Sequence, residues 1–254
     1  MRFASLGSGS RGNALVVESG QTRLMLDCGF GTRETTTRLE RLGLLPSDIA
    51  GILITHEHSD HIAGAFKFAR RHNLGVWMTH GTLAAAPRGL GELPRIEVID
   101  SHEIFSVGDL QVHPFPVPHD AREPVQFVFS DGTHRIGVLT DVGCSTPHIE
   151  QMLSGCDALV LECNHDLDLI AASNYPPSLK KRITSRFGHL DNQASAKLLA
   201  ALDVSRLQHI VAAHLSEQNN SVSRARLALA NVLGCAEEWI GVATQTEGFA
   251  WRCL

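Results

Sequence analysis

The stretch THEHSDHIAG, residues 55–64, places three histidines, an aspartate and a glutamate within ten positions. An apolar run rich in β-branched residues, 49–55, leads into it and predicts a buried strand. Ser59 or Asp60 can then cap a helix that we expect to continue to about Arg71. The pattern H-x-H-x-D-H therefore lies at a strand-to-helix junction, and a fold built around it must leave room there for a metal site.

Four side chains of this motif are of the types that bind first-row metals. His56 and His58 are two residues apart on leaving a strand, so they point the same way. Asp60 and His61 follow in the first helical turn and can face the same cavity. Imidazole and carboxylate together suit zinc, manganese or iron, and two pairs of ligands suit two metals. A polar turn without a metal is the alternative, but four ligand-type residues seldom occur at this spacing by chance.

Further ligand-type residues follow other predicted strands. They are His119, Asp141 and His214. A single histidine or aspartate of this kind is usually an ordinary loop residue. Strand ends on one edge of a sheet converge, however, so the recurrence of such residues at several strand ends predicts that they complete the metal site.

The rest of the chain reads as short strands first and alternating strands and helices later. Predicted strands cover residues 2–6, 14–18, 22–27, 49–55, 75–78, 95–99, 110–116, 125–129, 134–140, 158–163, 209–213 and 238–242. Predicted helices cover 35–42, 60–71, 146–153, 192–202 and 223–233. This order favours an α/β sandwich with helices outside the sheets. Neither a repeat nor a linker interrupts it, so we expect a single domain over 1–254, with two halves meeting near Asp141 as the alternative.

Composition excludes several classes of protein. Hydrophobic residues make up 43% of the chain and charged residues 19%, which is ordinary for a globular protein. An apolar run of about 18 residues is absent, so we expect no membrane span, and the first 14 residues lack the core of a signal peptide. The six scattered cysteines form no C-x-x-C pair, which predicts reduced thiols and a cytoplasmic location. A net charge of −5 excludes an overall basic nucleic-acid binder, but it allows a local basic patch.

These motifs together resemble those of the metallo-β-lactamase superfamily. THEHSDH matches its signature, and the later ligand-type residues fall at the order and spacing of its later motifs. The resemblance extends over essentially the whole chain and implies a four-layer αββα sandwich with the metal site at the edge of the two sheets. It also implies the ligand set: His56, His58 and His119 for one metal, Asp60, His61 and His214 for the other, and Asp141 as the bridge. Two cations about 3.5–4 Å apart would activate a water and polarise a phosphoryl or carbonyl oxygen.

The tRNase Z-like branch of this superfamily uses a strand-end glutamate and a helix-start histidine as a proton-delivery pair. Glu162 in ECNHD and His189 in GHLDNQ occupy these places. We therefore expect His189 to be the general acid for the leaving oxygen, oriented by Glu162; a structural neighbour of a helix cap is the alternative. His165 is a further histidine near the metals, either an added ligand or a phosphate contact. Asp191 stands where the GHL motif is expected to continue with a small polar residue such as serine.

Two segments are candidates for phosphate binding. The loop LGSGSRGNA, residues 6–14, offers backbone N–H groups and the polar side chains of Ser8, Ser10 and Asn13. A basic run follows between the two motifs of the proton-delivery pair, within residues 180–186. It would give the acidic chain a local patch for a phosphate backbone. A plain turn and a solvated helix face are the alternatives for these segments. The candidate residues are Ser8, Ser10, Asn13, Lys180, Lys181, Arg182 and Arg186.

The combination of LGSGSRGNA, THEHSDHIAG, PHDA, TDVG, ECNHD, GHLDNQ and HLSEQNN resembles the YycJ/WalJ subgroup, which is associated with 5′–3′ exonuclease activity on DNA. This resemblance implies a two-metal phosphodiesterase acting on DNA, or on RNA, with Zn²⁺ or Mn²⁺, or with Fe²⁺. Branches with a large inserted domain need a longer chain, tRNase Z has a Gly/Pro-rich arm that is not seen here, and a di-iron oxidase would carry an acidic residue at His58.

Two competing functions stay open. One is a hydrolase of a small cyclic phosphodiester, thioester or lactone on the same fold. The other is a metal-stabilised binding protein without turnover, which the complete ligand set disfavours. The oligomeric state is left open by the sequence.

Overall fold

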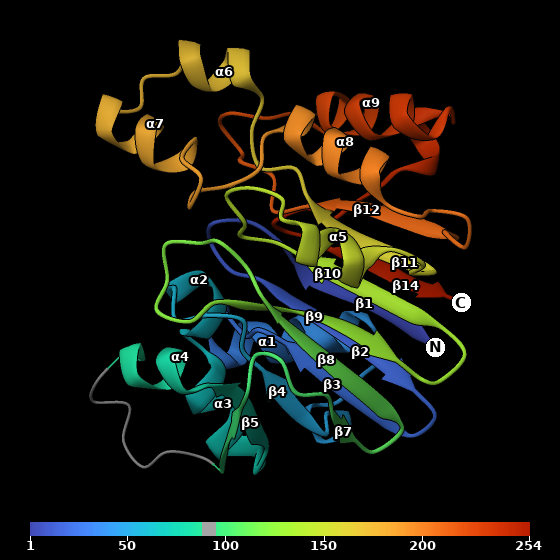
Figure 1. Cartoon of the computed structure of the whole chain (residues 1–254). Coiled ribbons are helices and arrows are strands. Elements are labelled where there is room, and N and C mark those ends of the chain that lie inside the picture. Colours follow the sequence, from blue (N-terminus) through green and yellow to red (C-terminus); the bar gives the residue numbers. More distant parts are fainter. Residues whose placement is uncertain (88–94) are drawn as a thin grey trace.

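The computed structural model describes residues 1–87 and 95–254, and it contains two seven-stranded mixed sheets packed face to face (Figure 1). The first sheet has the order β14-β1-β2-β3-β4-β5-β6. Its strands are β1 (Arg2–Gly7), β2 (Ala14–Ser19), β3 (Thr22–Leu26), β4 (Gly51–Leu53), β5 (Gly75–Thr79), β6 (Ile96–Ile99) and β14 (Phe249–Cys253). The second has the order β13-β12-β11-β10-β9-β8-β7. Its strands are β7 (Phe105–Val107), β8 (Leu110–Pro116), β9 (Val125–Ser130), β10 (Arg135–Leu139), β11 (Ala158–Glu162), β12 (His209–Ala213) and β13 (Gly241–Val242).

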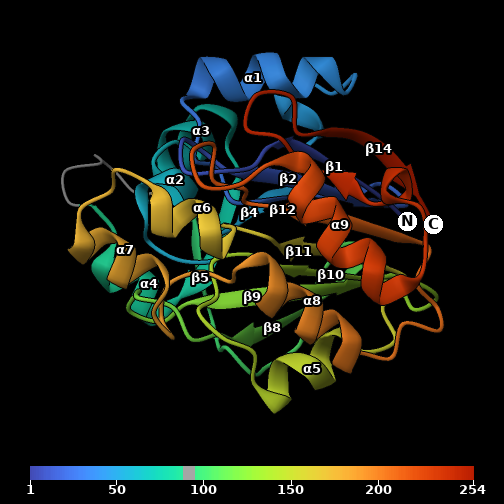
Figure 2. The same ribbon diagram turned by 90° about the horizontal axis from the view of Figure 1, so that it is seen from above.

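The helices of the described chain lie on the outer faces of the sheets or at the edges of the sandwich (Figure 2). They are α1 (Thr32–Arg41), α2 (Ser59–Ile62), α3 (Ala65–His72), α4 (His80–Ala85), α5 (Pro147–Leu153), α6 (Leu167–Ala172), α7 (Pro177–Ile183), α8 (Asn192–Ala201) and α9 (Val222–Leu233). The first sheet is covered by α1 and α3, and the second by α5, α8 and α9. This arrangement confirms the expected four-layer αββα sandwich.

Alternating side chains of the strands build three apolar layers. In β3, Leu24 and Leu26 enter the core between the sheets, whereas Met25 packs beneath the outer helices. In β11, Val160 faces the core between the sheets, and its neighbours Leu159 and Leu161 pack under the helices of the second sheet. Successive strand residues point to opposite faces, so strands buried on both sides read as continuous apolar runs.

The strand directions bring several chain segments to one edge of the sandwich. Strands β10, β11 and β12 are parallel, and both β8 and β10 run antiparallel to β9. The carboxyl ends of β8, β10, β11 and β12 therefore lie along the same edge. In the first sheet β3 and β4 are parallel and end beside α2. The segment with α6 and α7 lies at this same edge, on the left of both ribbon views (Figures 1 and 2).

The structure corrects parts of the predicted secondary structure. The single helix expected over 60–71 is divided into α2 and α3 at Gly64, where an added Cβ would lie 1.8 Å from a backbone oxygen of Phe30. The strand expected over 238–242 is shorter, because Glu237–Trp239 forms a 3₁₀ helix and only Gly241–Val242 pair with β12. The strands β7 to β13 form the second sheet, and β14 returns to the first sheet.

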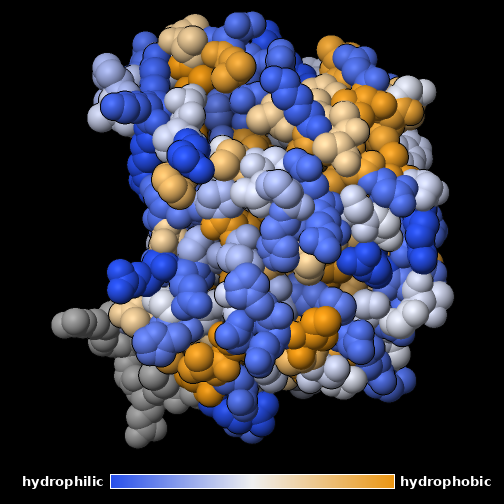
Figure 3. Space-filling model, in the orientation of Figure 1, coloured by the Kyte–Doolittle hydropathy of each residue, from blue (hydrophilic) through white to orange (hydrophobic). Residues whose placement is uncertain are grey.

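The surface shows polar side chains over most of the face in Figure 3, with apolar side chains gathered over α8 and α9 at the upper right. In the described part of the chain, helices are all too short or too polar to cross a bilayer. All six cysteines are free thiols, as the sequence predicts.

Candidate metal centre

Turns immediately after the strands hold the ligand-type residues at the shared edge. Asp27, Asp141 and His214 follow β3, β10 and β12 with φ angles of 59°, 52° and 55°. These left-handed conformations cost non-glycine residues about 1–3 kcal/mol each and persist only where neighbouring bonds fix them. The fixing bonds are present: the Asp141 N–H donates to the Glu162 carboxylate at 3.1 Å, and the His214 N–H donates to Ser8 Oγ at 2.9 Å.

Side chains that could hold a metal gather in three overlapping groups among the described residues, and two of these groups contain the expected ligands. The first, the three-histidine group, consists of His56, His58 and His119. The second, the four-ligand group, consists of Asp60, His61, Asp141 and His214. Within each group the candidate ligand atoms all lie within 4.8 Å of one another. The structure thus brings together all seven residues expected as ligands. The third group, Asp141, Glu162, His189 and His214, shares two of them.

The Asp141 carboxylate lies between the two groups. Its Oδ2 is 3.1 Å from His61 Nε2, and its Oδ1 is 3.9 Å from His119 Nε2. Oδ1 is also 3.6 Å from His214 Nδ1, so the carboxylate as a whole lies near imidazoles of both groups, as a bridging ligand requires.

Hydrogen bonds to Nδ1 orient three of these histidines. His56 Nδ1 is 2.9 Å from Thr55 Oγ1, and His61 Nδ1 is 2.7 Å from Asp27 Oδ2. His119 Nδ1 donates to a backbone oxygen at 3.0 Å. Partners of this kind fix the tautomer and leave Nε2 as the ligand atom. Thr55 Oγ1 also donates to Asp27. The Thr55 hydroxyl and the Asp27 carboxylate together therefore orient one ring of each group, His56 and His61.

The buried polar atoms of this site fit divalent cations. His56 Nε2 is buried and makes no hydrogen bond to any described residue. Asp141 Oδ2 and His214 Nε2 are also buried, and their partners are other ligand-type atoms, His61 Nε2 at 3.1 Å and Asp60 Oδ2 at 3.5 Å. Buried polar atoms in folded proteins are normally paired, and buried imidazole and carboxylate atoms that face one another in this way suit divalent cations.

The raised pKa values of two candidate ligands also fit a cation site. Burial lowers the pKa of His214, but Asp141, Asp60 and Glu162 outweigh it and raise that pKa to about 10. Burial also disfavours the charged form of His61, yet Asp141 and the neighbouring carboxylates raise its pKa well above the usual value. The carboxylates therefore favour positive charge on the neighbouring imidazoles. Bound cations would supply that positive charge instead.

Glu162, the last residue of β11, is a buried hydrogen-bond centre beside the metal groups. Its two oxygens accept from the backbone N–H groups of Asp141, Val142 and Leu190 at 3.0–3.1 Å. Its Oε1 also lies 2.8 Å from His189 Nδ1. Burial raises the pKa of Glu162, but the positive charge of His189 and the side-chain hydrogen bonds of His189 and His214 lower it to about 2. The ionised glutamate therefore holds the His189 ring with Nδ1 inward.

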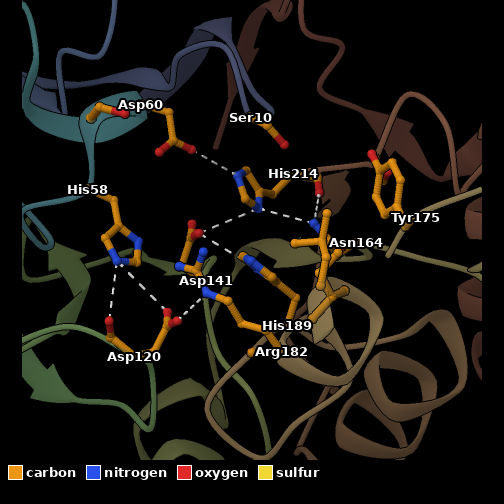
Figure 4. Close-up of a pocket in the computed structure, with 15 residues that line it drawn as sticks. Ser10, His58, Asp60, Asp120, Asp141, Asn164, Tyr175, Arg182, His189 and His214 are labelled. Carbon is orange, nitrogen blue, oxygen red and sulfur yellow. Dashed lines mark hydrogen bonds and ion pairs between the residues drawn. The ribbon is translucent and has the colours of Figure 1, made fainter. Parts of the chain in front are cut away.

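His189 borders the pocket above the metal groups (Figure 4). Burial lowers its pKa, but the adjacent Glu162 and Asp141 carboxylates raise it overall. The pocket, of about 390 Å³, is also lined by Asp60, Asp141 and His214, so His189 borders the same space as the ligands.

The Gly/Ser loop after β1 is bonded internally. The backbone N–H groups of Ser8, Gly9 and Asn13 donate to Thr244 O, Asn13 Oδ1 and Asp60 O. The Asn13 side chain donates back to the loop and lies 3.3 Å from Asp60 Oδ2. These three N–H groups already donate to oxygens of the protein. They therefore do not form the backbone cradle for a phosphate that the sequence predicts. Ser8 and Asn13 position His214 and Asp60, and Ser10 is the loop residue that lines the pocket.

The basic run forms α7 and the turn after it, and its members face different ways. Arg182 lines the pocket and donates to Asp120 Oδ2 at 2.6 Å. Lys180 donates to a backbone oxygen in α6, and Arg186 lies over the ring of Phe187. Lys181 is exposed. Of the four basic residues expected to contact phosphate, Arg182 alone lines the described pocket.

His165 joins neither metal group. It is buried, its Nδ1 lies 3.3 Å from Asn164 Oδ1, and its Nε2 makes no hydrogen bond to a described residue. Asn164 in turn donates to His214 O at 3.0 Å. Asp191 is the N-cap of α8, where its carboxylate accepts the N–H groups of Gln193 and Ala194. The acidic residue in the GHL motif is thus explained by helix capping.

Several residues of the site escaped the sequence interpretation. Asp27 was recognised only as a strand end, although its place after an apolar strand is the same signal that identified Asp141. Asp120 lies 3.4 Å from His119 Nε2, but its partner Arg182 is 62 positions away. Tyr175 lines the pocket from a segment without a recognisable motif. These roles depend on contacts between distant parts of the chain.

Known proteins share this architecture. A family model described as a β-lactamase superfamily domain matches residues 22–210. The chain is 35% identical over 253 residues to exodeoxyribonuclease YycJ of Bacillus anthracis, covering 97% of this chain and 94% of the relative. It is 30% identical to exodeoxyribonuclease WalJ of Streptococcus pneumoniae, covering 95% and 91%. The crystal structure of Zn²⁺-bound PqqB from Methylobacterium extorquens superposes with a TM-score of 0.77 at 20% identity, over the full length of both chains.

The αββα sandwich and the two ligand groups at its edge define a metal-dependent hydrolase. With the match of the family model over most of its length, the chain belongs to the β-lactamase superfamily.

Proposed function

We propose that this protein is a two-metal-dependent phosphodiesterase acting on nucleic acid, and specifically a 5′–3′ exonuclease on DNA. The observation that carries the proposal is the position of His189: held by Glu162, it borders the same pocket as ligands of both metal groups. A group that delivers a proton to a leaving oxygen must lie beside the centre that activates the nucleophile. Similarity to YycJ and WalJ over almost the whole chain supports DNA as the substrate.

The chain's residues have distinct proposed roles. The three-histidine group holds one cation and the four-ligand group the other, with Asp141 shared between them. When bound, the cations lower the pKa of a water and polarise a phosphoryl oxygen. His189 donates from Nδ1 to Glu162, and as the imidazolium, which the Glu162 and Asp141 carboxylates favour, it can give its Nε2 proton to the leaving oxygen. His165 acts through Asn164, which is bonded to the backbone of His214. Mixed imidazole and carboxylate donors suit Zn²⁺ or Mn²⁺, and Fe²⁺ as well.

A digestion assay tests the proposal. Linear duplex DNA with a 5′ phosphate and a label at either end is incubated with the protein and separately supplied Mn²⁺ or Zn²⁺. We expect stepwise loss of nucleotides from the 5′ end, absent in Asp60→Ala, which removes a ligand of the four-ligand group. RNA of the same sequence is the parallel substrate. Intact DNA and RNA of every end type with both metals would overturn the nuclease assignment.

The orientation of α7 keeps a small-substrate hydrolase as the second candidate. Arg182 is the member of the basic run that lines the pocket, so the positive charge available to a long phosphate backbone is smaller than the sequence suggests. A small cyclic phosphodiester, thioester or lactone would need no more positive charge than Arg182 provides.

Exchanging Arg182 for alanine distinguishes the two candidates. We expect Arg182→Ala to raise the KM for DNA and to reduce the slope of log affinity against log salt by about 1, because one phosphate contact is lost. Lys181→Ala is the matched control, since Lys181 lies on the same helix but outside the pocket lining. Equal effects of both variants, or an affinity independent of salt, would favour the small-substrate hydrolase.

A further inference from the structure

One wall of the metal pocket is apolar and has no part in metal binding or proton delivery. It consists of Tyr175, Leu179 and Ile183. Leu179 and Ile183 are four residues apart on α7, so they lie on the same face of the helix, and Tyr175 precedes its first residue by two positions. The remaining lining is mostly polar or charged. A substrate that reached the metals would therefore meet one apolar surface in the described part of this pocket.

The Tyr175 side chain is available to a ligand. It is half-buried, and within the described chain its phenol makes no hydrogen bond and its ring has no aromatic or cationic partner. Its backbone N–H donates to Ser173 Oγ at 3.4 Å, which helps to fix the turn before α7. Figure 4 shows the ring on the side of the pocket occupied by Asn164 and His214, away from His58 and Asp120. Tyr175 is also the single tyrosine of the sequence.

We propose that Tyr175, backed by Leu179 and Ile183, stacks against a nucleobase next to the phosphate that is cleaved. This inference rests on the proposed function, because it assumes a nucleic-acid strand in the pocket. The strand's phosphate belongs beside the ligand groups and His189, which are polar, whereas its bases need an apolar or aromatic surface. Every base presents a π-face, so stacking on an aromatic ring binds a strand without selecting its sequence. Such a contact suits an enzyme that must degrade successive nucleotides of any identity.

The structural alternative is that Tyr175 only holds α7 in place. The two roles differ in one measurable respect: a stacking residue loses its effect when the base is removed, and a structural residue does not. Tyr175→Phe keeps the ring and Tyr175→Ala removes it. Phe187→Ala is the matched control, because Phe187 is an exposed aromatic residue just beyond α7 that does not line the pocket.

The experiment compares 5′-phosphorylated oligonucleotides that carry an abasic tetrahydrofuran unit at position one, two or three with the same strand bearing all its bases. We expect one abasic position to lower the kcat/KM of the original enzyme about tenfold, which is the usual range for one stacked base. Tyr175→Ala should lose the same factor on the intact strand and nothing further on that abasic strand. Tyr175→Phe and Phe187→Ala should behave like the original enzyme.

Two results would overturn the inference while leaving the nuclease assignment intact. One is an equal loss by Tyr175→Ala on intact and abasic strands, which indicates a structural role. The other is full activity of Tyr175→Ala on the intact strand. An enzyme that hydrolyses methyl p-nitrophenyl phosphate but cuts none of the strands would instead contradict the proposed function, and this inference with it.

Discussion

Replacing Asp141 with alanine should abolish hydrolysis and remove bound metal. The Asp141 carboxylate lies 3.1 Å from His61 Nε2 and 3.9 Å from His119 Nε2, so it is the residue that reaches both ligand groups. Losing a partner of a ligand typically costs about 10–100-fold in metal affinity or activity, and losing a shared ligand should cost more. We therefore expect a fall in activity of at least about 100-fold.

Elemental analysis of the purified variant, together with its rate on DNA, checks this expectation. Asp27→Asn is the graded control, because Asp27 touches His61 Nδ1 without facing the cations. Its loss should fall within about 10–100-fold, with metal restored at higher concentration. Circular dichroism would show that both variants are folded. If Asp141→Ala kept two metals and full activity, the shared-ligand assignment would be wrong; if no variant of the site changed any activity, a binding protein without turnover would be the better description.

The ligand groups could be predicted from the sequence because their positions follow from strand direction. Asp141 and His214 each come directly after an apolar strand, and β10 and β12 run the same way on either side of β11. Parallel neighbours end at one edge, so residues just past their ends must meet. The spacing of His56 and His58 predicts, within a single segment, that these two side chains lie together as well.

Other features depend on contacts that no local pattern carries. Strand β14 was missed because it pairs with β1, at the opposite end of the chain. The run at 180–186 was interpreted by charge alone, although Pro177 marks a helix start and Leu179 and Ile183 give α7 an apolar face. The Gly/Ser loop looked like a phosphate cradle, but its N–H groups meet acceptors such as Thr244 O and Asp60 O from distant segments.

His189→Ala should separate proton delivery from metal binding. On DNA, whose leaving oxygen needs a proton, we expect a loss of about 10²–10⁴-fold. On methyl p-nitrophenyl phosphate the variant should remain close to the original enzyme, because p-nitrophenolate is stable without a proton. The metal content should not change, since His189 Nδ1 is bonded to Glu162 and the two ligand groups are complete without it.

Steady-state rates on both substrates and elemental analysis decide the outcome together. His189, Asp141, Glu162 and His214 also lie close enough to one another to hold an ion. If that ion were essential, His189→Ala would lose metal and would fail equally on both substrates. A fall in kcat confined to DNA, with the KM for DNA unchanged, comes from the leaving-group step. The ratio of the two kcat values then measures what His189 contributes there, independently of how tightly the cations are held.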